Sequence, residues 1–475
     1  MMRIKRQSYL LMIGMTVMLA SVGMKVQAEV KLPAIFCDKM VMQQQSDCHI
    51  WGTANANHTV KVKTSWDRQP YQVKTDATGK WNLTIKTPKA GGPYLMTLND
   101  GTETQIKDIM IGEVWICSGQ SNMEMPIKGF KGQPVEDALH TLMTCEDNAL
   151  RLFTVKRNAS LTPATDVTGQ WSTASSESVR EFSATAYYYG RALRQALHVP
   201  VGLIVVSWGG SACEAWMAAD WLKAFPTVRL PKDDADVNKR LNRCPTALYE
   251  GMLKPIIGYA MRGVIWYQGE DNVNRYSNYA DLLTTMIRGW RNDWQEGDFP
   301  FYYCQIAPYD YSLIQWHGSE YLREQQMKAE SMLPNVRMAV LMDAGLEYGI
   351  HPRKKQVAGE RLAMLSLAST YGMKGMPEFA VYRGVTFSND TADVTFDHSK
   401  EWVYFNHGTK SDLFEIAGED KVFYPAQAWI SRNHVYVKSV EVKHPVAVRY
   451  AFHDWADGDL MHDGLPISSF RTDNW

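Results

Sequence analysis

A serine that follows a glycine turn at the end of an apolar stretch is the first residue in this 475-residue chain that could do chemistry. Ile109 to Cys117 predicts a buried strand, and Gly119-Gln120-Ser121-Asn122-Met123 comes directly after it. A serine there can present its hydroxyl to a cleft, and it becomes a nucleophile when a neighbouring base accepts its proton. The position also suits a helix N-cap, because serine accepts hydrogen bonds from backbone N–H groups. The local pattern leaves both interpretations open.

Two further strand ends carry groups that can stabilise a developing negative charge. Ser207-Trp208-Gly209-Gly210-Ser211 follows the apolar run from Val201 to Val206, and its glycines let a backbone N–H approach a ligand closely. Trp266-Tyr267-Gln268-Gly269-Glu270-Asp271-Asn272 follows another buried strand. Gln268 can donate to an oxyanion, and Glu270 can orient the loop or bind a substrate hydroxyl. Taken singly, each segment could equally be a plain turn.

A histidine can supply the base that such a serine needs. His351 lies between Ile350 and Pro352, and Asp343 comes just after the apolar run 336–341. Ser, Asp, His is one of the chain orders that catalytic triads adopt, and a loop histidine can act as general base and acid. A lone histidine is more often structural. The joint occurrence of four such segments favours catalysis, because reactive groups in open α/β sheets lie beyond the carboxyl ends of the strands.

The elements that must position these groups fall into three regions. Residues 29–107 contain short alternating strands such as Val60-Lys61-Val62-Lys63, with turn signals between them, and predict a small β-sandwich. Residues 108–375 contain continuous apolar strands separated by helical spacing, as at 184–197 and 278–294, and predict a parallel sheet covered on both faces. Residues 376–475 alternate again, as in Ala392 to Phe396, and predict a second β module.

Composition and the N-terminus limit the possible partners and location. The formal net charge of −1 gives no reason to expect binding to nucleic acid. Arg3, Lys5 and Arg6 precede the apolar stretch 9–18, and Val26-Gln27-Ala28 offers small residues for cleavage. Residues 1–28 therefore predict a signal peptide and export to the periplasm or the outside. After its removal we expect no membrane span.

The seven cysteines are scattered along the chain without a C-x-x-C pair. This spacing gives no support to a zinc or thioredoxin-like site, and we expect neither a metal nor a cofactor. The odd number leaves at least one thiol free. One or two disulfides would be possible in an oxidising compartment.

Together the segments resemble the sialate O-acetylesterase family of SGNH-type hydrolases. The resemblance is carried by Gly112 to Glu124, by Pro200 to Ile204, by Ser207 to Gly210, by Trp266 to Glu270 and by His351-Pro352-Arg353. It continues in Leu32-Pro33, Met40 to Gln44, Phe414 to Asp420 and Phe470 to Asp473, and so covers nearly the whole mature chain. The resemblance implies a flavodoxin-like, three-layer α/β/α fold for the central domain, with a β module on each side.

The resemblance also implies roles for individual residues. It makes Ser121 the nucleophile, His351 the base, and Gly210, rather than Gly209, an oxyanion donor beside the N–H of Ser121. Gln268 stands near the position where related enzymes place an Asn donor. Contacts to the substrate are expected from Asn122, Trp208, Glu270 and Arg353, with no metal.

The chain departs from the family pattern at the acid partner of the histidine. Related enzymes often place an Asp two or three residues before the His, and here those positions are Gly349 and Tyr348. Asp343 is the first choice for this role and Glu347 the second, and a Ser–His dyad is the third possibility. Ser211 replaces the more usual Thr and Asp271 stands where Ser is common, which could alter the substrate rim.

The predicted activity is removal of acetyl groups from sugars, with 9-O-acetylated sialic acid as the first candidate substrate. The carboxylate of that sugar needs a cation, and Arg275, Arg323 and Arg353 lie near the motifs in sequence. An acetyl-xylan or other polysaccharide esterase would use the same machinery. A non-catalytic sugar-binding protein is a further alternative, given the β modules and an aromatic content of 11%.

Overall fold

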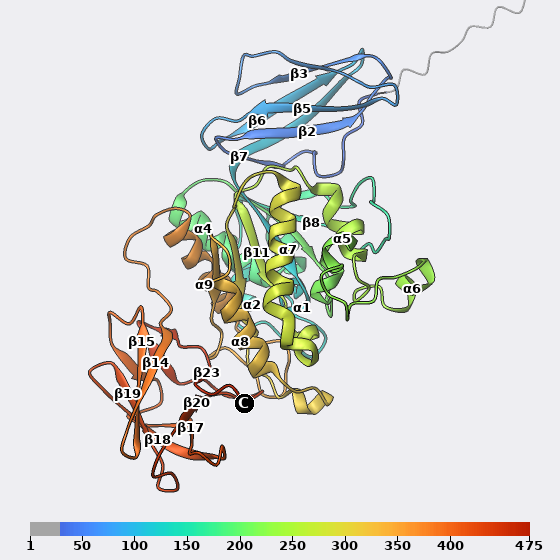
Figure 1. The fold of residues 1–475 in the computed structure, drawn as a ribbon. Coiled ribbons are helices and arrows are strands. Elements are labelled where there is room, and N and C mark those ends of the chain that lie inside the picture. Colours follow the sequence, from blue (N-terminus) through green and yellow to red (C-terminus); the bar gives the residue numbers. More distant parts are fainter. Residues whose placement is uncertain (1–28) are drawn as a thin grey trace, which may run out of the picture.

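The computed structural model describes residues 29–475, so the predicted signal peptide lies outside the described residues. Three parts follow one another along the molecule in Figure 1: strands at the N-terminal end, a central region of strands and helices, and strands at the C-terminal end. No helix in the described range is long and apolar enough to cross a membrane. All seven cysteines lie in this range, and each of them is a free thiol.

Apart from β1, which pairs in parallel with β7 (Glu103–Gly119), the N-terminal strands form two antiparallel groups whose inward side chains share one core. β2 pairs with β5, while β3 pairs with β4 and β6. Val60 and Val62 are buried and the lysines that follow them are exposed, which confirms the predicted alternation. The strands are β1 (Val41–Gln43), β2 (Asp47–Thr53), β3 (Thr59–Thr64), β4 (Tyr71–Lys74), β5 (Lys80–Lys86) and β6 (Gly91–Asn99).

One long strand, β7 (Glu103–Gly119), joins the first region to the second. Its first half pairs with β6, and its second half pairs with β10 (Val201–Ser207) and β11 (Gly263–Tyr267) in the central sheet. Its burial pattern changes from alternating to continuous along the way. β7 therefore runs through the boundary expected at 107–108, because the change in patterning marks a change of neighbours and not a break in the strand.

The central sheet has the order β13-β12-β11-β7-β10-β8-β9. Every neighbouring pair is parallel except β8 and β9 at one edge, which confirms the predicted parallel sheet. The parallel arrangement brings the carboxyl ends of β7, β10 and β11 to one edge. The strands not yet defined are β8 (Asp147–Thr154), β9 (Trp171–Ala174), β12 (Phe301–Cys304) and β13 (Val336–Ala339).

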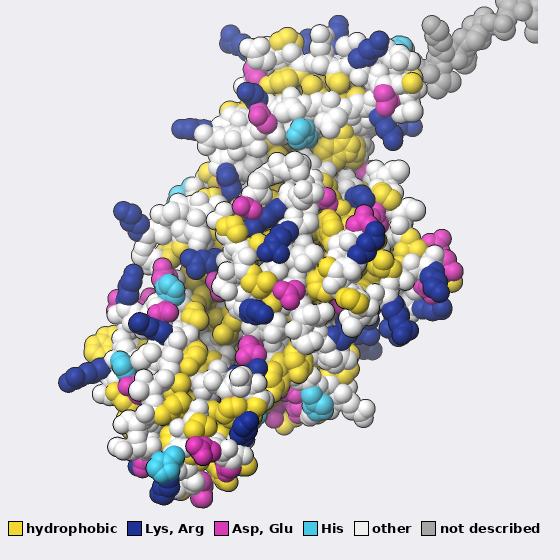
Figure 2. All heavy atoms as spheres, viewed as in Figure 1, with side chains coloured by type: hydrophobic (Ala, Val, Ile, Leu, Met, Phe, Trp, Pro, Cys, Tyr) yellow, Lys and Arg dark blue, Asp and Glu magenta, His cyan; other side chains and the backbone are white. Residues whose placement is uncertain are grey.

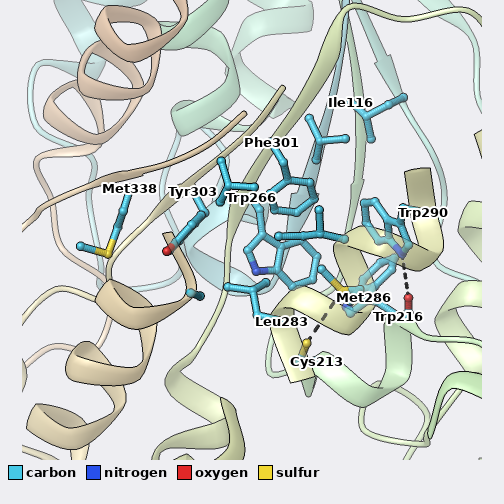
Figure 3. Packing of buried hydrophobic residues seen from close by; sticks show 14 of the residues in the cluster. Ile116, Cys213, Trp216, Trp266, Leu283, Met286, Trp290, Phe301, Tyr303 and Met338 are labelled. Carbon is cyan, nitrogen blue, oxygen red and sulfur yellow. Dashed lines mark hydrogen bonds between the residues drawn. The ribbon is translucent and has the colours of Figure 1, made fainter. Parts of the chain in front are cut away.

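Helices pack on both faces of this sheet, because successive strand residues point into two different cores. Trp115 and Cys117 contact the side that carries α4 (Ala184–Leu197) and α9 (Lys355–Ser369). Ile116 and Trp266 point to the other side, with α7 (Tyr279–Trp294) and α8 (Ser319–Glu330). Figure 3 shows Trp266 on that side, packed among Trp216, Trp290 and Phe301.

The helix predicted at 184–197 is confirmed, and local signals explain both of its ends. The Ser183 hydroxyl accepts the Ala186 N–H at its start, and His198 closes it with a φ of 56° two residues before Pro200. Shorter helices fill the connections: α1 (Ser121–Glu124), α2 (Ala138–Thr144), α3 (Ser176–Glu181), α5 (Ala219–Leu222), α6 (Asp234–Lys239), and the turns η1 (Cys213–Trp216), η2 (Tyr249–Leu253), η3 (Lys254–Ile256), η4 (Glu270–Asn278) and η5 (Tyr311–Ile314).

The C-terminal strands form a seven-stranded antiparallel sheet with the order β14-β15-β19-β18-β17-β20-β23. Arg323 on α8 is fully buried and donates to Ser469 Oγ and to the His453 carbonyl, which ties this sheet to the central region. Its strands are β14 (Val381–Ser388), β15 (Thr391–Asp397), β17 (Ser411–Ala417), β18 (Phe423–Ser431), β19 (His434–Lys438), β20 (Ala447–Tyr450) and β23 (Phe470–Arg471). A separate three-stranded sheet is formed by β16 (Val403–Phe405), β21 (Leu460–His462) and β22 (Leu465–Pro466).

Candidate active site

The four segments singled out in the sequence meet at the carboxyl edge of the central sheet. A pocket of about 450 Å³ lies there. Its walls come from the ends of β7, β10 and β11 and from the loop that joins β13 to α9. They include Ser121, Gly209, Gly210, Glu270 and His351. The pocket thus unites the predicted nucleophile, the predicted base and the predicted oxyanion loop.

The turn before Ser121 can be made only with a glycine. Gly119 has a φ of 138°, and a Cβ at this position would lie 2.1 Å from the Tyr267 carbonyl oxygen. The next residue, Gln120, donates its N–H to that same carbonyl at 2.9 Å and is the N-cap of α1. Ser121 is therefore the first residue of the helix and not its cap. Ser121 lines the pocket, and its N–H has no partner within the helix.

His351 is held by the turn 129–133, which no sequence signal pointed to. The ring Nδ1 lies 2.5 Å from Gln133 Oε1, and the Phe130 ring meets the imidazole edge-on at a centroid distance of 5.1 Å. In this orientation the amide oxygen can only accept, so Nδ1 carries the proton and Nε2 keeps its lone pair. Burial, with a contribution from Lys355, lowers the pKa of His351 to about 4. The ring is therefore neutral, and able to accept a proton, over the physiological range.

The choice of Asp343 as the acid partner needs correction. Both carboxylate oxygens of Asp343 are bound by Arg361, at 2.6 and 2.7 Å. Within residues 29–475, the Gln133 contact is the one hydrogen bond of the His351 ring, and Glu347, the second choice, interacts with Tyr348. A nearby arginine is a stronger partner for a carboxylate than a neutral imidazole, and this explains why Asp343 faces α9.

The loop after β10 presents one free N–H to the pocket. Gly209 donates its N–H to Glu124 Oε2 at 2.8 Å, and Glu124 is fixed in turn by two 2.7 Å contacts with Arg157. Gly210 has a φ of 67°, and its N–H has no hydrogen-bond partner in the described part of the chain. Of the backbone N–H groups of Ser121, Gly209 and Gly210, only those of Ser121 and Gly210 are therefore without a partner in the described chain.

Gln268 does not supply a further oxyanion donor, which corrects the sequence expectation. Its side chain is fully buried, and its two amide hydrogens are used by the Ser211 carbonyl at 3.1 Å and by Asn272 Oδ1 at 2.8 Å. Its Oε1 accepts from the Tyr279 hydroxyl at 2.7 Å. Gln268 thus connects the loops that follow β10 and β11, beneath the pocket.

Asn122 also has a structural role, in place of the expected contact with the substrate. It is 1% exposed, and its Nδ2 donates to Glu270 Oε1 at 2.5 Å and to the Ile350 carbonyl at 3.1 Å. Its Oδ1 accepts from the buried ammonium of Lys355, whose pKa burial lowers to about 7. Through Ile350, this buried cluster fixes the loop that carries His351.

Glu270 agrees with its expected position in the pocket wall. One carboxylate oxygen is bonded to Asn122, while Oε2 has no hydrogen-bond partner among the residues described. Burial is the main reason that the pKa of Glu270 is raised. This oxygen is itself buried, so Glu270 contributes to the pocket wall without presenting Oε2 to the pocket space.

The two remaining residues expected to contact the substrate lie outside the pocket, and two arginines that were not singled out in the sequence line it. Trp208 is half-buried under the Arg157 guanidinium, 5.5 Å from its ring centroid, and Arg353 is exposed; neither lines the pocket. Arg157 and Arg243 do line it. Neither arginine belongs to a motif at a strand end, so no local signal could have identified them. Of the other cations considered, Arg323 is buried beneath the C-terminal sheet, and Arg275 pairs with Glu214 at 3.5 Å.

A serine hydroxyl, a neutral histidine and free backbone N–H groups at the carboxyl edge of a parallel sheet are the components of a serine hydrolase. The family model described as "Carbohydrate esterase, sialic acid-specific acetylesterase" matches residues 111–363. The chain therefore belongs to this family of carbohydrate esterases and is a carboxylic ester hydrolase. This sets aside the alternative of a non-catalytic sugar-binding protein.

Individual relatives agree with this membership. The sialate O-acetylesterase of Rattus norvegicus is 27% identical over 403 residues, which cover 71% of this chain and 73% of the relative. The Homo sapiens enzyme of the same name is 27% identical over 379 residues, covering 71% and 70%. A solved structure titled as a novel carbohydrate acetylesterase from Xanthomonas citri is 34% identical, covers 94% of this chain and 100% of its own, and superimposes with a TM-score of 0.86.

Proposed function

We propose that this enzyme removes the 9-O-acetyl group from sialic acid, with Ser121 as nucleophile and His351 as base. The observation that carries the proposal is the common pocket of Ser121, His351 and Gly210. Glu270 lies in the wall of the same pocket and is the candidate group for binding a sugar hydroxyl. In the related flavodoxin-like SGNH hydrolases such a site lies on a three-layer α/β/α domain, and we assign residues 108–375 to that type.

The proposed reaction proceeds through an acetyl-enzyme. His351 Nε2 accepts the Ser121 proton while the hydroxyl oxygen attacks the acetyl carbonyl carbon. The N–H groups of Ser121 and Gly210 stabilise the oxyanion, and loss of one such donor typically lowers turnover by about 100- to 1,000-fold. The sugar alcohol leaves with the proton from His351. Water then attacks the acetyl-enzyme by the same route and releases acetate.

The proposal also covers the segments on either side of the central domain. The β regions 29–107 and 376–475 are flanking modules, and residues 1–28 direct export to the periplasm or the outside. Support for export comes from the basic residues, apolar stretch and small-residue site at the N-terminus. Support for the modules comes from the antiparallel pairing among β2 to β6 and among the C-terminal strands, which contrasts with the parallel central sheet that β7 joins to the N-terminal strands.

Acetate release from matched substrates tests the substrate assignment. We expect kcat/KM for 9-O-acetylated sialic acid to exceed that for acetylated xylan by at least about tenfold, because only the sialic acid offers a carboxylate to the cationic side chains near the pocket. Initial rates should be measured by an enzymatic acetate assay on both substrates. The Ser121→Ala protein gives the background in each case.

The alternative is an esterase of acetylated xylan or another neutral polysaccharide. The specific observation in its favour is that the Xanthomonas citri relative is titled only as a carbohydrate acetylesterase, without mention of sialic acid. If the enzyme hydrolysed acetylated xylan faster in this assay, acetylated xylan would become the assigned substrate in place of sialic acid. It would leave the roles of Ser121 and His351 unchanged.

Gln133 holds the position where a triad would have its acid, so its replacement by Glu should alter the pH dependence. In Gln133→Glu a carboxylate would face the Nδ1–H of His351 and raise the pKa of the ring. We expect the acid limb of kcat/KM to move to higher pH by at least about one unit. Gln133→Ala removes one hydrogen bond and should lower kcat roughly threefold to tenfold.

The pH profile of p-nitrophenyl acetate hydrolysis measures both effects. Gln195→Glu, an exposed substitution on α4, introduces the same charge away from the site and should leave the profile unchanged. If Gln133→Glu kept the wild-type acid limb, the assignment of Gln133 to His351 would be wrong.

A further inference from the structure

A second and larger cavity lies beside the catalytic pocket. Its volume is about 670 Å³, within the range of roughly 300–1,000 Å³ that small-molecule sites occupy. Its wall comes mainly from the segment 227–245, which includes α6, and from the start of η4. Arg243 and Asp271 line both cavities, and their ion pair, with Nε 2.6 Å from Oδ1, is the partition between them. A ligand in one space therefore lies next to the other.

The larger cavity is strongly cationic, although the whole chain has a formal net charge of −1. Three carboxylates line it, and each has a cationic partner: Asp236 with Lys239, Glu214 with Arg275, and Asp271 with Arg243. Six cationic side chains line it, which leaves an excess of three positive charges: Arg229, Lys232, Lys239, Arg240, Arg243 and Arg275. Figure 2 shows lysine and arginine side chains gathered around α6.

Three of these cations, Arg229, Lys232 and Arg240, form no ion pair within residues 29–475. Unpaired like charges that gather on one wall repel each other, and an anion between them relieves that repulsion. Arginine also binds carboxylates through two parallel hydrogen bonds, which fixes their orientation. The wall further offers Thr227 and Asn278, whose side chains suit sugar hydroxyls.

We propose that this cavity is an anion-binding subsite that holds a carboxylate of an acidic glycan while its acetyl ester lies at Ser121. The inference rests on the proposed esterase function and specifies what surrounds the acetylated position. The carboxylate can belong to the acetylated sugar itself or to the next sugar along the chain. Both sources present the same chemistry to Arg229, Lys232 and Arg240.

Direct binding tests the subsite without depending on catalysis. Calorimetry with the Ser121→Ala protein should show binding of N-acetylneuraminic acid, or of a disaccharide in which glucuronic acid is linked to a neutral hexose. The methyl ester of the same ligand should bind at least about tenfold more weakly, because it cannot form the charged hydrogen bonds. Equal affinities for acid and ester would overturn the proposal.

Arg240→Glu is the informative variant, because the side chain of Arg240 is exposed and forms no hydrogen bond or ion pair within the described chain. Combined with Ser121→Ala, it should weaken binding of the acid about tenfold or more and leave binding of the methyl ester unchanged. Arg68→Glu makes the same charge change on an exposed arginine of the N-terminal region and should have no effect. The proposed subsite would be contradicted if both variants lost the same affinity for the acid. It would also be contradicted if neither variant lost affinity.

The two ligands distinguish the source of the carboxylate. Weakening of N-acetylneuraminic acid by Arg240→Glu assigns the carboxylate to the acetylated sugar itself. Weakening of the disaccharide alone assigns it to the neighbouring sugar. If neither ligand responds, the proposal fails.

Hydrolysis of p-nitrophenyl acetate separates this inference from the proposed function. Arg240→Glu, with Ser121 intact, should retain wild-type kcat/KM on this neutral ester, because the residue lies outside the catalytic pocket. An enzyme that released acetate from no acetylated sugar would contradict the proposed function. The calorimetric comparison would still decide the subsite.

Discussion

Replacing Ser121 by alanine should lower kcat for acetate release on the order of 10⁴- to 10⁶-fold, on acetylated sugars and on p-nitrophenyl acetate alike. The hydroxyl is the attacking group in the proposed mechanism, and no other side chain of the pocket wall is a serine, threonine or cysteine. The residual rate would come from the oxyanion donors and from binding. Acetate release and nitrophenol release measure the loss on the two kinds of substrate.

Ser118→Ala is the matched control, three residues earlier in the same segment. Ser118 is fully buried on β7 and its hydroxyl donates to the Val206 carbonyl at 2.6 Å. Its removal should lower stability by about 1 kcal/mol and leave kcat within a few-fold of wild type. Thermal unfolding of both variants shows whether any loss comes from misfolding. A Ser121→Ala protein with wild-type activity would remove this serine from the mechanism.

The second large effect is expected from His351→Ala, which should lower kcat on the order of 10⁴- to 10⁶-fold. Without the imidazole, the group that accepts the Ser121 proton in the proposed mechanism is lost. Initial rates on p-nitrophenyl acetate measure the loss. His317→Ala, at an exposed histidine beside Asp454, is the control and should retain full activity.

The pH profile gives an independent measure of the same histidine. The active form is the neutral ring, and the pKa of His351 is lowered to about 4 by burial and by Lys355. The neutral fraction rises with pH through that value, so kcat/KM should be level near neutrality and fall only below about pH 5. An acid limb near the ordinary histidine pKa of about 6.5 would mean that the ring is more hydrated than its position indicates.

Local patterns were sufficient for most of the elements that carry the site. The helix 184–197 followed from its spacing and from the proline after it, and the buried strands at 201–206 and 264–267 followed from continuous apolar runs. Such signals are reliable because the period of a helix or strand is a property of neighbouring residues. The parallel arrangement then required the segments after those strands to lie at one edge.

Partners of individual polar groups were not predictable in this way. The sequence offered Asp343 and Glu347 for His351, because both lie close to it along the chain. The structure pairs the ring with Gln133, 218 residues away, and gives Asp343 to Arg361. The pairing of two polar side chains depends on how loops from distant parts of the chain pack together. The periodicity of a local sequence segment contains no information about that packing.

The sequence by itself determined the class of elements, the parallel sheet and the set of residues gathered at its carboxyl edge, Ser121 and His351 among them. These depend on local periodicity and on the direction of the strands. Only the tertiary structure decided which of those residues face the pocket. It placed Asn122 and Gln268 in the interior and brought Arg157 and Arg243 to the pocket wall. Burial and hydrogen-bond saturation are properties of the packed loops, which form only when distant segments meet.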